Sequence, residues 1–244
     1  MCSMRGIILL KNRGIFIIQV FFVIFLFACS QKALKDSRFE NLIIDAQKNI
    51  ENGNYSKALI LIKDAIKLDS SQSIAFLVRG KINSLLENDS SAIKDYTKAI
   101  HLNPQNTSAY FHQGVSYSLM DRDDLAINCF NEAIRTKTEG SLIFETSNND
   151  LLIFERQIDV TMPALRFYRG KSFYNLKRDS LSLEDFLYCI NTNYNKSNSL
   201  LYAGVLLLNK GVLEKGCLYL REAYVLGNED AKRYISKFCK STSN

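Results

Sequence analysis

Small residues recur every 34 positions along this 244-residue chain, and large apolar residues stand at fixed distances from them. Three series of small positions run through residues 39–140, and each resumes after a shift of 22 residues. The fifteen positions are Ala46, Gly80, Gly114, Gly170 and Gly204; Ala58, Ala92, Ala126, Ser182 and Gly216; and Ala65, Ala99, Ala133, Cys189 and Ala223. A period of this length indicates stacked supersecondary repeats.

Each repeat predicts two helices joined by a turn. A large apolar residue follows the second small position by four residues, at Ile62, Tyr96, Phe130, Phe186 and Leu220. This spacing is that of an apolar helix face. Between the first and second small positions lie polar stretches of turn composition, such as Glu51–Asn54 and Asp121–Asp124. The expected fold class is therefore all-α, with each helix pair covered by its neighbour.

The pattern resembles the tetratricopeptide repeat (TPR) family, whose 34-residue unit carries small residues at positions 8, 20 and 27. Repeats of that family would begin at Phe39, Ser73, Thr107, Pro163 and Ser197. The resemblance implies a right-handed superhelical solenoid of about five helix pairs. Residues 39–140 would form three repeats, and residues 163–240 would form two more and a C-terminal capping helix.

Two details modify this resemblance. Arg166 occupies position 4 of the fourth repeat, where the family often has Trp, so we expect the start of that helix to be the weakest. The fifth repeat also resembles Sel1-like repeats, a related family, at Gly204, Lys210–Gly211 and Gly227–Asn228.

Residues 141–162 interrupt the period as an insertion of 22 residues. The sequence Leu-Ile-Phe-Glu occurs in it twice, at Leu142–Glu145 and Leu152–Glu155, around the turn-like stretch Ser147–Asp150. Two apolar runs joined by a turn predict a hairpin, and a longer helical connection is the alternative. Pro163 suits the first turn of the helix that follows.

Residues 1–28 have the pattern of a secretory signal. Three basic residues precede an apolar run over 15–27, which Gln19 interrupts. The run is short for a membrane span, which needs about 20 apolar residues. Removal of this segment is therefore expected, and a retained membrane anchor is the alternative.

The end of the apolar run resembles the lipobox of bacterial lipoproteins, at Leu26–Cys29. The resemblance implies that Cys29 becomes the lipidated N-terminus and attaches the protein to a membrane surface, with residues 29–38 as a linker. Ser30 follows the cysteine and, by the same resemblance, favours the outer membrane of a bacterial envelope.

The net charge and the cysteine spacing argue against nucleic-acid binding and against a metal site. The formal net charge of +6 falls to +3 without residues 1–28, which is too mild to indicate nucleic-acid binding. Outside the signal and the lipobox, the cysteines are Cys129, Cys189, Cys217 and Cys239, without the spacing of a metal site. Buried thiols are the default expectation, and a bridge between Cys217 and Cys239 is the alternative.

The sequence contains no common catalytic or nucleotide-binding motif. We expect His101 to be exposed and His112 to pack rather than to act as a base. The acidic residues Asp121, Asp123 and Asp124 fall in a predicted turn, where a solvated cluster is expected rather than a metal site. The sequence therefore predicts no enzyme, no cofactor and no metal.

By resemblance to the family, the first helix of each repeat lines the inner face of the solenoid. The candidate groove for partners comprises Leu77, Lys81, Phe111, Phe167, Lys171 and Tyr174, with Leu201 and Val205 in the fifth repeat. Aromatic residues beside lysines suit a protein or peptide segment. The Lys/Asn set with which some family members bind a terminal carboxylate is not reproduced.

These features predict a membrane-anchored adaptor that binds protein segments through its concave groove. An assembly factor for an outer-membrane or pilus-type complex is the alternative. An enzyme with its site in residues 141–162 is a third reading.

Overall fold

The computed structural model describes residues 31–32, 34–140 and 160–239. The described residues form helices and turns, with no strand among them. The chain divides into two compact units, an N-terminal unit of residues 1–70 and a C-terminal unit of residues 71–244. This all-helical content confirms the expected fold class.

The N-terminal unit contains the first repeat. One helix covers residues 34–51 and the second, α2, spans Tyr55–Leu68. Ala46, Ala58 and Ala65, the small positions of this repeat, are fully buried. The residues expected to form a linker before the repeat are helical over 31–32 and 34–38, so the helix begins earlier than the repeat pattern predicts.

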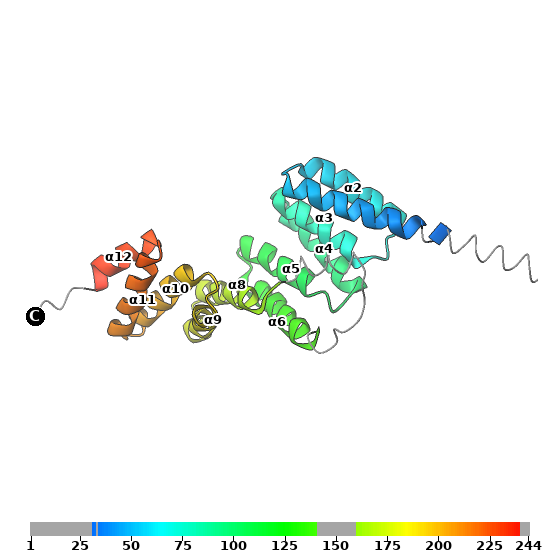
Figure 1. Cartoon of the computed structure of the whole chain (residues 1–244). Helices are drawn as coiled ribbons and strands as arrows, with labels where there is room; N and C mark the ends of the chain where they lie inside the picture. The colour runs from blue at the N-terminus through cyan, green and yellow to red at the C-terminus, as the bar shows by residue number, and fades with distance from the viewer. Residues whose placement is uncertain (1–30, 33, 141–159, 240–244) are drawn as a thin grey trace, which may run out of the picture. The chain divides into compact units, whose positions relative to one another are not determined.

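The C-terminal unit contains nine described helices in chain order (Figure 1). They are α3 (Ser73–Leu85), α4 (Asp89–Leu102), α5 (Thr107–Leu119), α6 (Asp123–Gly140), α8 (Met162–Asn175), α9 (Asp179–Asn191), α10 (Lys196–Asn209), α11 (Leu213–Val225) and α12 (Glu229–Phe238). Helices pair within a repeat, as α3 with α4, and the second helix of each pair packs on the first helix of the next pair. This arrangement is that of a helical solenoid.

All fifteen small positions of the sequence pattern are buried. The reason is visible at Gly80, where an added Cβ would lie 2.5 Å from Cε1 of Tyr96 on the partner helix. At Gly114 a Cβ would lie 2.7 Å from Cε1 of Phe130. The first small position of these repeats is therefore small because a large ring of the second helix occupies the space beside it.

The five turns within repeats share one backbone feature. The fifteenth residue of each repeat has a left-handed backbone, with φ of 72°, 58°, 56°, 55° and 78° at Gly53, Glu87, Asp121, Lys177 and Gly211. Glycine adopts this conformation without strain, whereas residues with a Cβ do so at a cost. Three of the five turns therefore carry local strain that the helix pairs on either side offset.

The fourth repeat packs on the third as the other repeats pack on one another. Helix α8 contacts α6 directly, although the insertion separates them in sequence. Pro163 lies in the first turn of α8, as predicted, and the N-cap Thr161 accepts a hydrogen bond from the Ala164 N–H. The hairpin expected within 141–162 lies mostly outside the described residues.

Candidate functional site

The first helices of the C-terminal unit carry the predicted groove residues, and two of these belong to the core instead. Leu77 on α3 is 2% exposed and Phe167 on α8 is 6% exposed. Phe167 packs edge to face on Phe186 of the partner helix, with ring centroids 5.8 Å apart. Both side chains therefore pack mainly within the core, and neither lines the cavity described below.

Two further aromatic residues join neighbouring repeats. The ring of Phe111 on α5 meets Tyr168 on α8 edge to face, with centroids 5.2 Å apart. Tyr174 on α8 meets Tyr202 on α10 in the same way at 5.1 Å. Phe111 and Tyr174 are both half-buried, so each packs between repeats and keeps part of its surface accessible.

The two predicted groove lysines are both half-buried. The ammonium of Lys171 lies 5.9 Å from the centroid of the Tyr168 ring. Lys81 is half-buried, and its charge contributes to lowering the pKa of His112. Burial is the larger cause, and together they lower the pKa of His112 to about 3.

His112 packs, as the sequence predicts. Its ring stacks on Tyr96 with centroids 5.9 Å apart and an interplanar angle of 22°. With a pKa near 3, the imidazole is neutral at physiological pH and is poorly matched to proton transfer there. His101 is exposed, also as expected.

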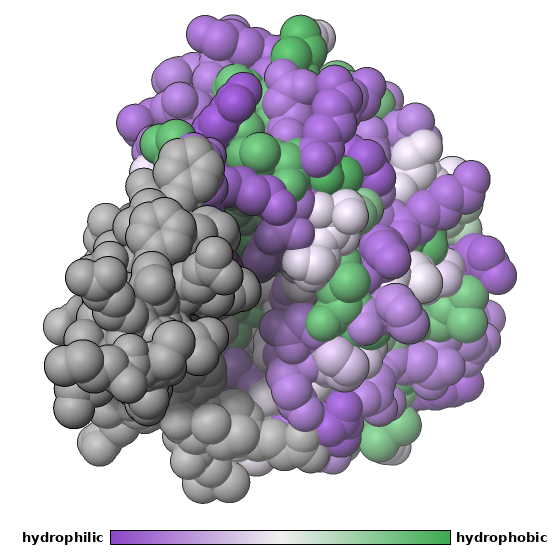
Figure 2. Space-filling view, turned by 90° about the vertical axis from the view of Figure 1, so that its right-hand side faces the viewer, coloured by the Kyte–Doolittle hydropathy of each residue, from purple (hydrophilic) through white to green (hydrophobic). Residues whose placement is uncertain are grey.

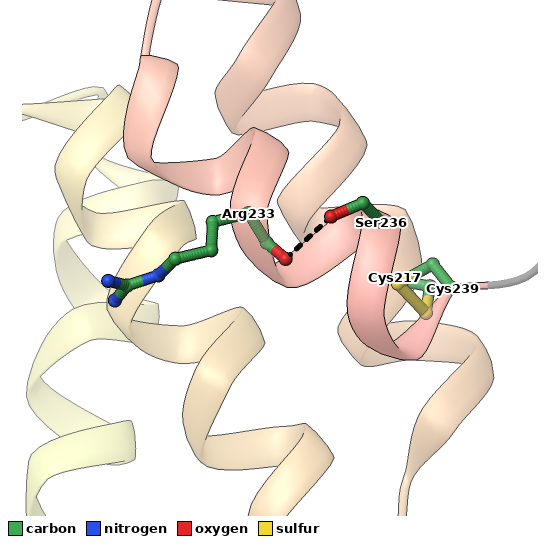
Figure 3. The surroundings of a disulfide bond; sticks show 4 residues. All are labelled: Cys217, Arg233, Ser236 and Cys239. Atoms are coloured by element: carbon green, nitrogen blue, oxygen red, sulfur yellow. Dashed lines mark hydrogen bonds between the residues drawn. A yellow bond between two sulfur atoms is a disulfide. The ribbon is translucent and has the colours of Figure 1, made fainter.

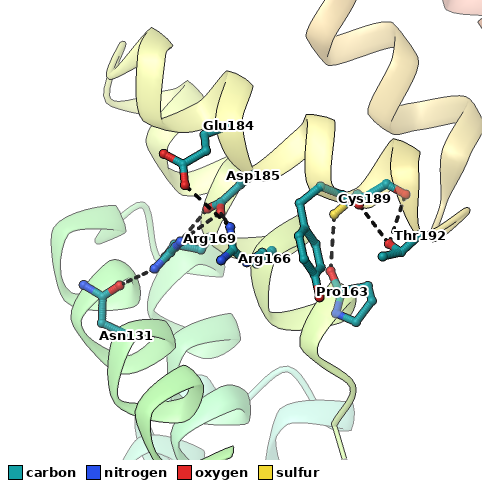
Figure 4. Close-up of polar contacts among 9 residues, drawn as sticks. Asn131, Pro163, Arg166, Arg169, Glu184, Asp185, Cys189 and Thr192 are labelled. Carbon is teal, nitrogen blue, oxygen red and sulfur yellow. Dashed lines mark hydrogen bonds and ion pairs between the residues drawn. The ribbon is translucent and has the colours of Figure 1, made fainter. Parts of the chain in front are cut away.

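A polar cluster that the sequence analysis missed lies between α8 and α9 (Figure 4). Asp185 is fully buried and accepts two hydrogen bonds from the guanidinium of Arg169, each 2.8 Å long. Arg169 also donates to Oδ1 of Asn131 at 2.8 Å, so the cluster extends to α6 of the preceding repeat. The signal that could have revealed it is an Arg and an Asp 16 residues apart at the same positions of two repeats, since Arg79 and Asp95 pair likewise.

Arg166, the departure from the family pattern, joins the same cluster. Its Nη1 lies 3.5 Å from Asp185 and 3.7 Å from Glu184, and its guanidinium lies 4.4 Å from the centroid of the Tyr188 ring. An arginine is thus accommodated at this position by acidic and aromatic partners on α9.

The acidic turn is only partly solvated. Asp123 is 6% exposed and accepts hydrogen bonds from Ser118 at 3.0 Å and from Asn175 at 3.0 Å. The expectation of a solvated cluster was wrong for this residue, because its carboxylate joins the third and fourth repeats. Among the described residues, no group of three His, Cys, Asp or Glu side chains could hold a metal ion.

The cysteines divide into two kinds. Cys129 and Cys189 are free and buried, and burial raises the pKa of each thiol to about 12, which leaves them protonated and poorly nucleophilic. Cys217 on α11 and Cys239 after α12 form a disulfide, with Cα atoms 5.5 Å apart (Figure 3). The sequence analysis gave buried thiols as the default and a Cys217–Cys239 bridge as the alternative, and the bridge is what the structure contains.

A cavity of about 360 Å³ lies between α10 and α12. Helix α10 contributes Val205, Leu208 and Asn209, and helix α12 contributes Arg233, Tyr234, Lys237 and Phe238. Val205 is one of the positions that the sequence places on the inner face. In Figure 3 the side chain of Arg233 and the disulfide lie on opposite sides of α12.

One face of the molecule is mixed in character. On the face shown in Figure 2, hydrophobic residues are scattered among hydrophilic ones. No helix within the described residues has the length and apolar character needed to cross a membrane.

Pairs of helices stacked one on the next define a helical-repeat solenoid. Residues 107–138, which correspond to the third repeat, match the tetratricopeptide repeat family. The sequence match to this family thus covers one repeat. The comparison with curated protein sequences gave no match.

Solved structures of TPR proteins are similar to this chain in fold. A crystal structure of MamA has a TM-score of 0.60 and 16% identity and covers 79% of this chain and 97% of its own. YrrB, described as a TPR protein with an unusual peptide-binding site, has a TM-score of 0.62 and 18% identity over 80% and 90%. PilF of Pseudomonas aeruginosa has a TM-score of 0.60 and 16% identity over 85% and 95%.

Proposed function

We propose that this protein is a lipid-anchored scaffold that binds protein segments on the inner face of its stacked first helices. The observation that supports this most directly is the cavity between α10 and α12, where apolar side chains of a first helix face two cations and two aromatic rings. Aromatic and arginine side chains around a concave surface are typical of protein recognition. YrrB, which shares the fold, has a peptide-binding site.

The membrane attachment rests on the sequence at Leu26–Cys29. A diacylglycerol on the Cys29 thiol and a further acyl chain would hold the chain at a bacterial membrane surface, with the outer membrane favoured by Ser30. Within this proposal His112, Cys129 and Cys189 have no catalytic role, because the imidazole is neutral at physiological pH and the two thiols are protonated. The comparisons identify no catalytic family.

The test is crosslinking in intact cells, followed by purification of the full-length chain from membranes and identification of the crosslinked proteins. Lys171→Gln and Tyr174→Ala, on the inner face, should each reduce the recovery of partners. Lys94→Ala changes an exposed residue of α4 and serves as the control. Recovery that is equal for the folded inner-face variants and the wild type would contradict binding at this face.

An assembly factor for an outer-membrane or pilus-type complex is the second candidate. Two consecutive repeats expose apolar pairs in their turns, Leu85 with Leu86 and Leu119 with Met120, between 39% and 65% exposed. Exposed apolar groups of this kind favour a permanent partner. In that case the chain should co-purify with one protein in fixed ratio, and Leu119→Ser with Met120→Ser should release it.

A further inference from the structure

Helix α12 forms one wall of the C-terminal cavity. It occupies the place that the first helix of a sixth repeat would take. Helix α12 packs on α11 and also contacts α10, just as α5 packs on α4 and contacts α3. It therefore continues the inner face by one more element. The cavity between α10 and α12 is for this reason part of the inner face and not of the outer surface.

Two cations line the cavity. Arg233 and Lys237 lie four residues apart on α12, and neither forms an ion pair within the described part of the chain. The described residues that line the cavity include no carboxylate. Like charges at this spacing on a helix repel each other, so an anion at this position would be favourable.

Aromatic rings hold both cations at the cavity. The guanidinium of Arg233 lies 5.1 Å from the centroid of the Tyr234 ring and donates a hydrogen bond to the Tyr234 hydroxyl at 3.2 Å. The ammonium of Lys237 lies 4.9 Å from the centroid of the Phe238 ring. These contacts limit the freedom of two long side chains and leave their remaining N–H groups available to an acceptor.

The apolar part of the cavity comes from α10. Val205 is 7% exposed and Leu208 is half-buried, and this helix carries no acidic residue. The other wall is α12, and the Cys217–Cys239 disulfide links the end of this helix to α11. The bridge therefore limits the movement of α12. A cavity with fixed walls binds with a smaller loss of conformational freedom.

We infer that this cavity binds an acidic peptide segment of a partner protein, with one large apolar side chain against Val205 and Leu208 and flanking carboxylates on Arg233 and Lys237. The inference rests on the proposed scaffold function and specifies the partner class for one site. A volume of about 360 Å³ is sufficient for one aromatic side chain and part of the adjoining backbone.

The chain contains no tryptophan, which provides a direct probe. The peptide acetyl-Ser-Glu-Leu-Trp-Glu-Ser-amide carries the proposed chemistry, and its blocked ends remove any terminal carboxylate. Tryptophan emission then comes from the peptide alone. On titration with the full-length protein in detergent, the emission should shift to the blue and its anisotropy should rise.

Two control peptides separate the two parts of the site. Replacing both glutamates with glutamine keeps the shape and removes the charge, and replacing the leucine with serine keeps the charge and reduces the apolar anchor. Both peptides should bind more weakly than the parent. Equal binding of the glutamine peptide would overturn the proposal.

Variants of α12 locate the site. Arg233→Gln and Lys237→Gln should each weaken binding about fivefold, the upper range for a solvent-accessible ion pair. Lys232→Gln makes the same charge change at an exposed position of the same helix outside the cavity and should leave binding unchanged. Equal weakening by all three variants would indicate a general charge effect and would overturn the proposal. Failure of the wild-type protein to bind the peptide would also overturn it.

The outcomes also separate this proposal from the scaffold function. If Arg233→Gln and Lys237→Gln bind the peptide as tightly as the wild type does, while inner-face variants at Lys171 and Tyr174 still lose crosslinked partners, the cavity proposal fails and the scaffold function stands. If none of these variants changes partner recovery, the scaffold function fails independently of the peptide titration.

Discussion

Arg169 on α8 and Asp185 on α9 form a two-pronged ion pair in which Nε and Nη2 each donate to one carboxylate oxygen at 2.8 Å. Two repeats earlier, Arg79 and Asp95 occupy the same positions, and Nε of Arg79 lies 3.1 and 3.0 Å from the two oxygens of Asp95. A bidentate pair of this kind fixes both the distance and the rotation between the two helices of a repeat.

Arg169→Gln should destabilise the protein by about 3 kcal/mol, because it leaves the fully buried Asp185 with the longer contact to Arg166 as its remaining ion pair. The free energy of unfolding in urea measures this loss. Arg178→Gln is the matched control, since it breaks an exposed pair with Asp124 and should cost less than about 1 kcal/mol. Equal losses in the two variants would contradict a structural role of the buried pair.

The deficit of Arg169→Gln should also depend on pH. Burial raises the pKa of Asp185 by more than its bonds to Arg169 lower it. Because the folded pKa exceeds the unfolded one, the contribution of this carboxyl to stability is fully present below the unfolded pKa and is lost as pH rises through the folded pKa. Removing Arg169 should raise the folded pKa further. The deficit should therefore shrink as the pH is lowered, and a deficit constant with pH would exclude Asp185 as its cause.

The left-handed turn residues make a second prediction. Gly211→Ala should destabilise by about 1 kcal/mol, since no neighbouring atom lies within 4 Å of the added Cβ and only backbone strain acts. Lys177→Gly, at the same position of the preceding repeat, should stabilise by up to about 0.5 kcal/mol, because relief of strain slightly exceeds the added entropy of the unfolded chain. Thermal unfolding of the two variants tests both expectations. A change of stability in the same direction for Gly211→Ala and Lys177→Gly would refute the shared turn geometry.

The second small position gives a third prediction. Ala126 on α6 is fully buried, and Ala126→Leu adds three carbons where two helices meet, so it should destabilise by about 1–3 kcal/mol or more. Asn128→Leu places the same side chain at an exposed position of the same helix and should change stability by less than about 0.5 kcal/mol. An unchanged melting temperature for Ala126→Leu would show that the assigned repeat register is wrong.

The repeat architecture could be predicted because its determinants are local and periodic. Ala58, Gly80 and Cys189 are small for the same reason, a close approach between helices that returns every 34 residues. The Arg169–Asp185 pair was harder to predict, because charged residues on a helix are usually solvated. At the corresponding positions of the third repeat, the thiol of Cys129 donates to Oε1 of Gln113 at 3.3 Å, so the pair is not periodic throughout the solenoid.

The groove could be predicted only in part. The repeat pattern places Leu77 and Phe167 on a first helix, but how deeply each is buried depends on the side chains of the partner helix and the next repeat. The cavity depends on a contact between Val205 and α12, which is set by tertiary stacking. The apolar face of α12 predicted a capping helix. No pattern in the sequence predicted that Arg233 and Lys237 would line a cavity with α10.

The lipid anchor makes a fourth prediction. Mass spectrometry of the mature N-terminus should find Cys29 acylated, and Cys29→Ser should leave the precursor uncleaved and loosely attached to membranes. The reason is that the thiol is the nucleophile that receives the diacylglycerol, so serine cannot replace it in this reaction. An unmodified mature N-terminus at another residue would rule the anchor out.

The disulfide leads to the last prediction, which concerns the stability of α12 alone. This helix has 10 residues, fewer than the number needed for an isolated helix to be stable in water, and Ala231 is its buried residue. The Cys217–Cys239 bridge joins residues 22 positions apart. Closing a loop of this length lowers the entropy of the unfolded chain and so stabilises the folded state by about 3 kcal/mol. Reduction should therefore allow α12 to open while α8 and α9 stay folded.

Hydrogen exchange followed by mass spectrometry can resolve this local effect. On reduction, residues 229–238 should lose protection, and the Cys217→Ser, Cys239→Ser double variant should show the same loss without a reductant. Cys129→Ser is the control, because Cys129 is a free buried thiol and its replacement should leave α12 protected. If α12 remains protected after reduction, the packing of Ala231, Tyr234 and Ile235 is sufficient to hold it, and the bridge is not what fixes the wall of the cavity.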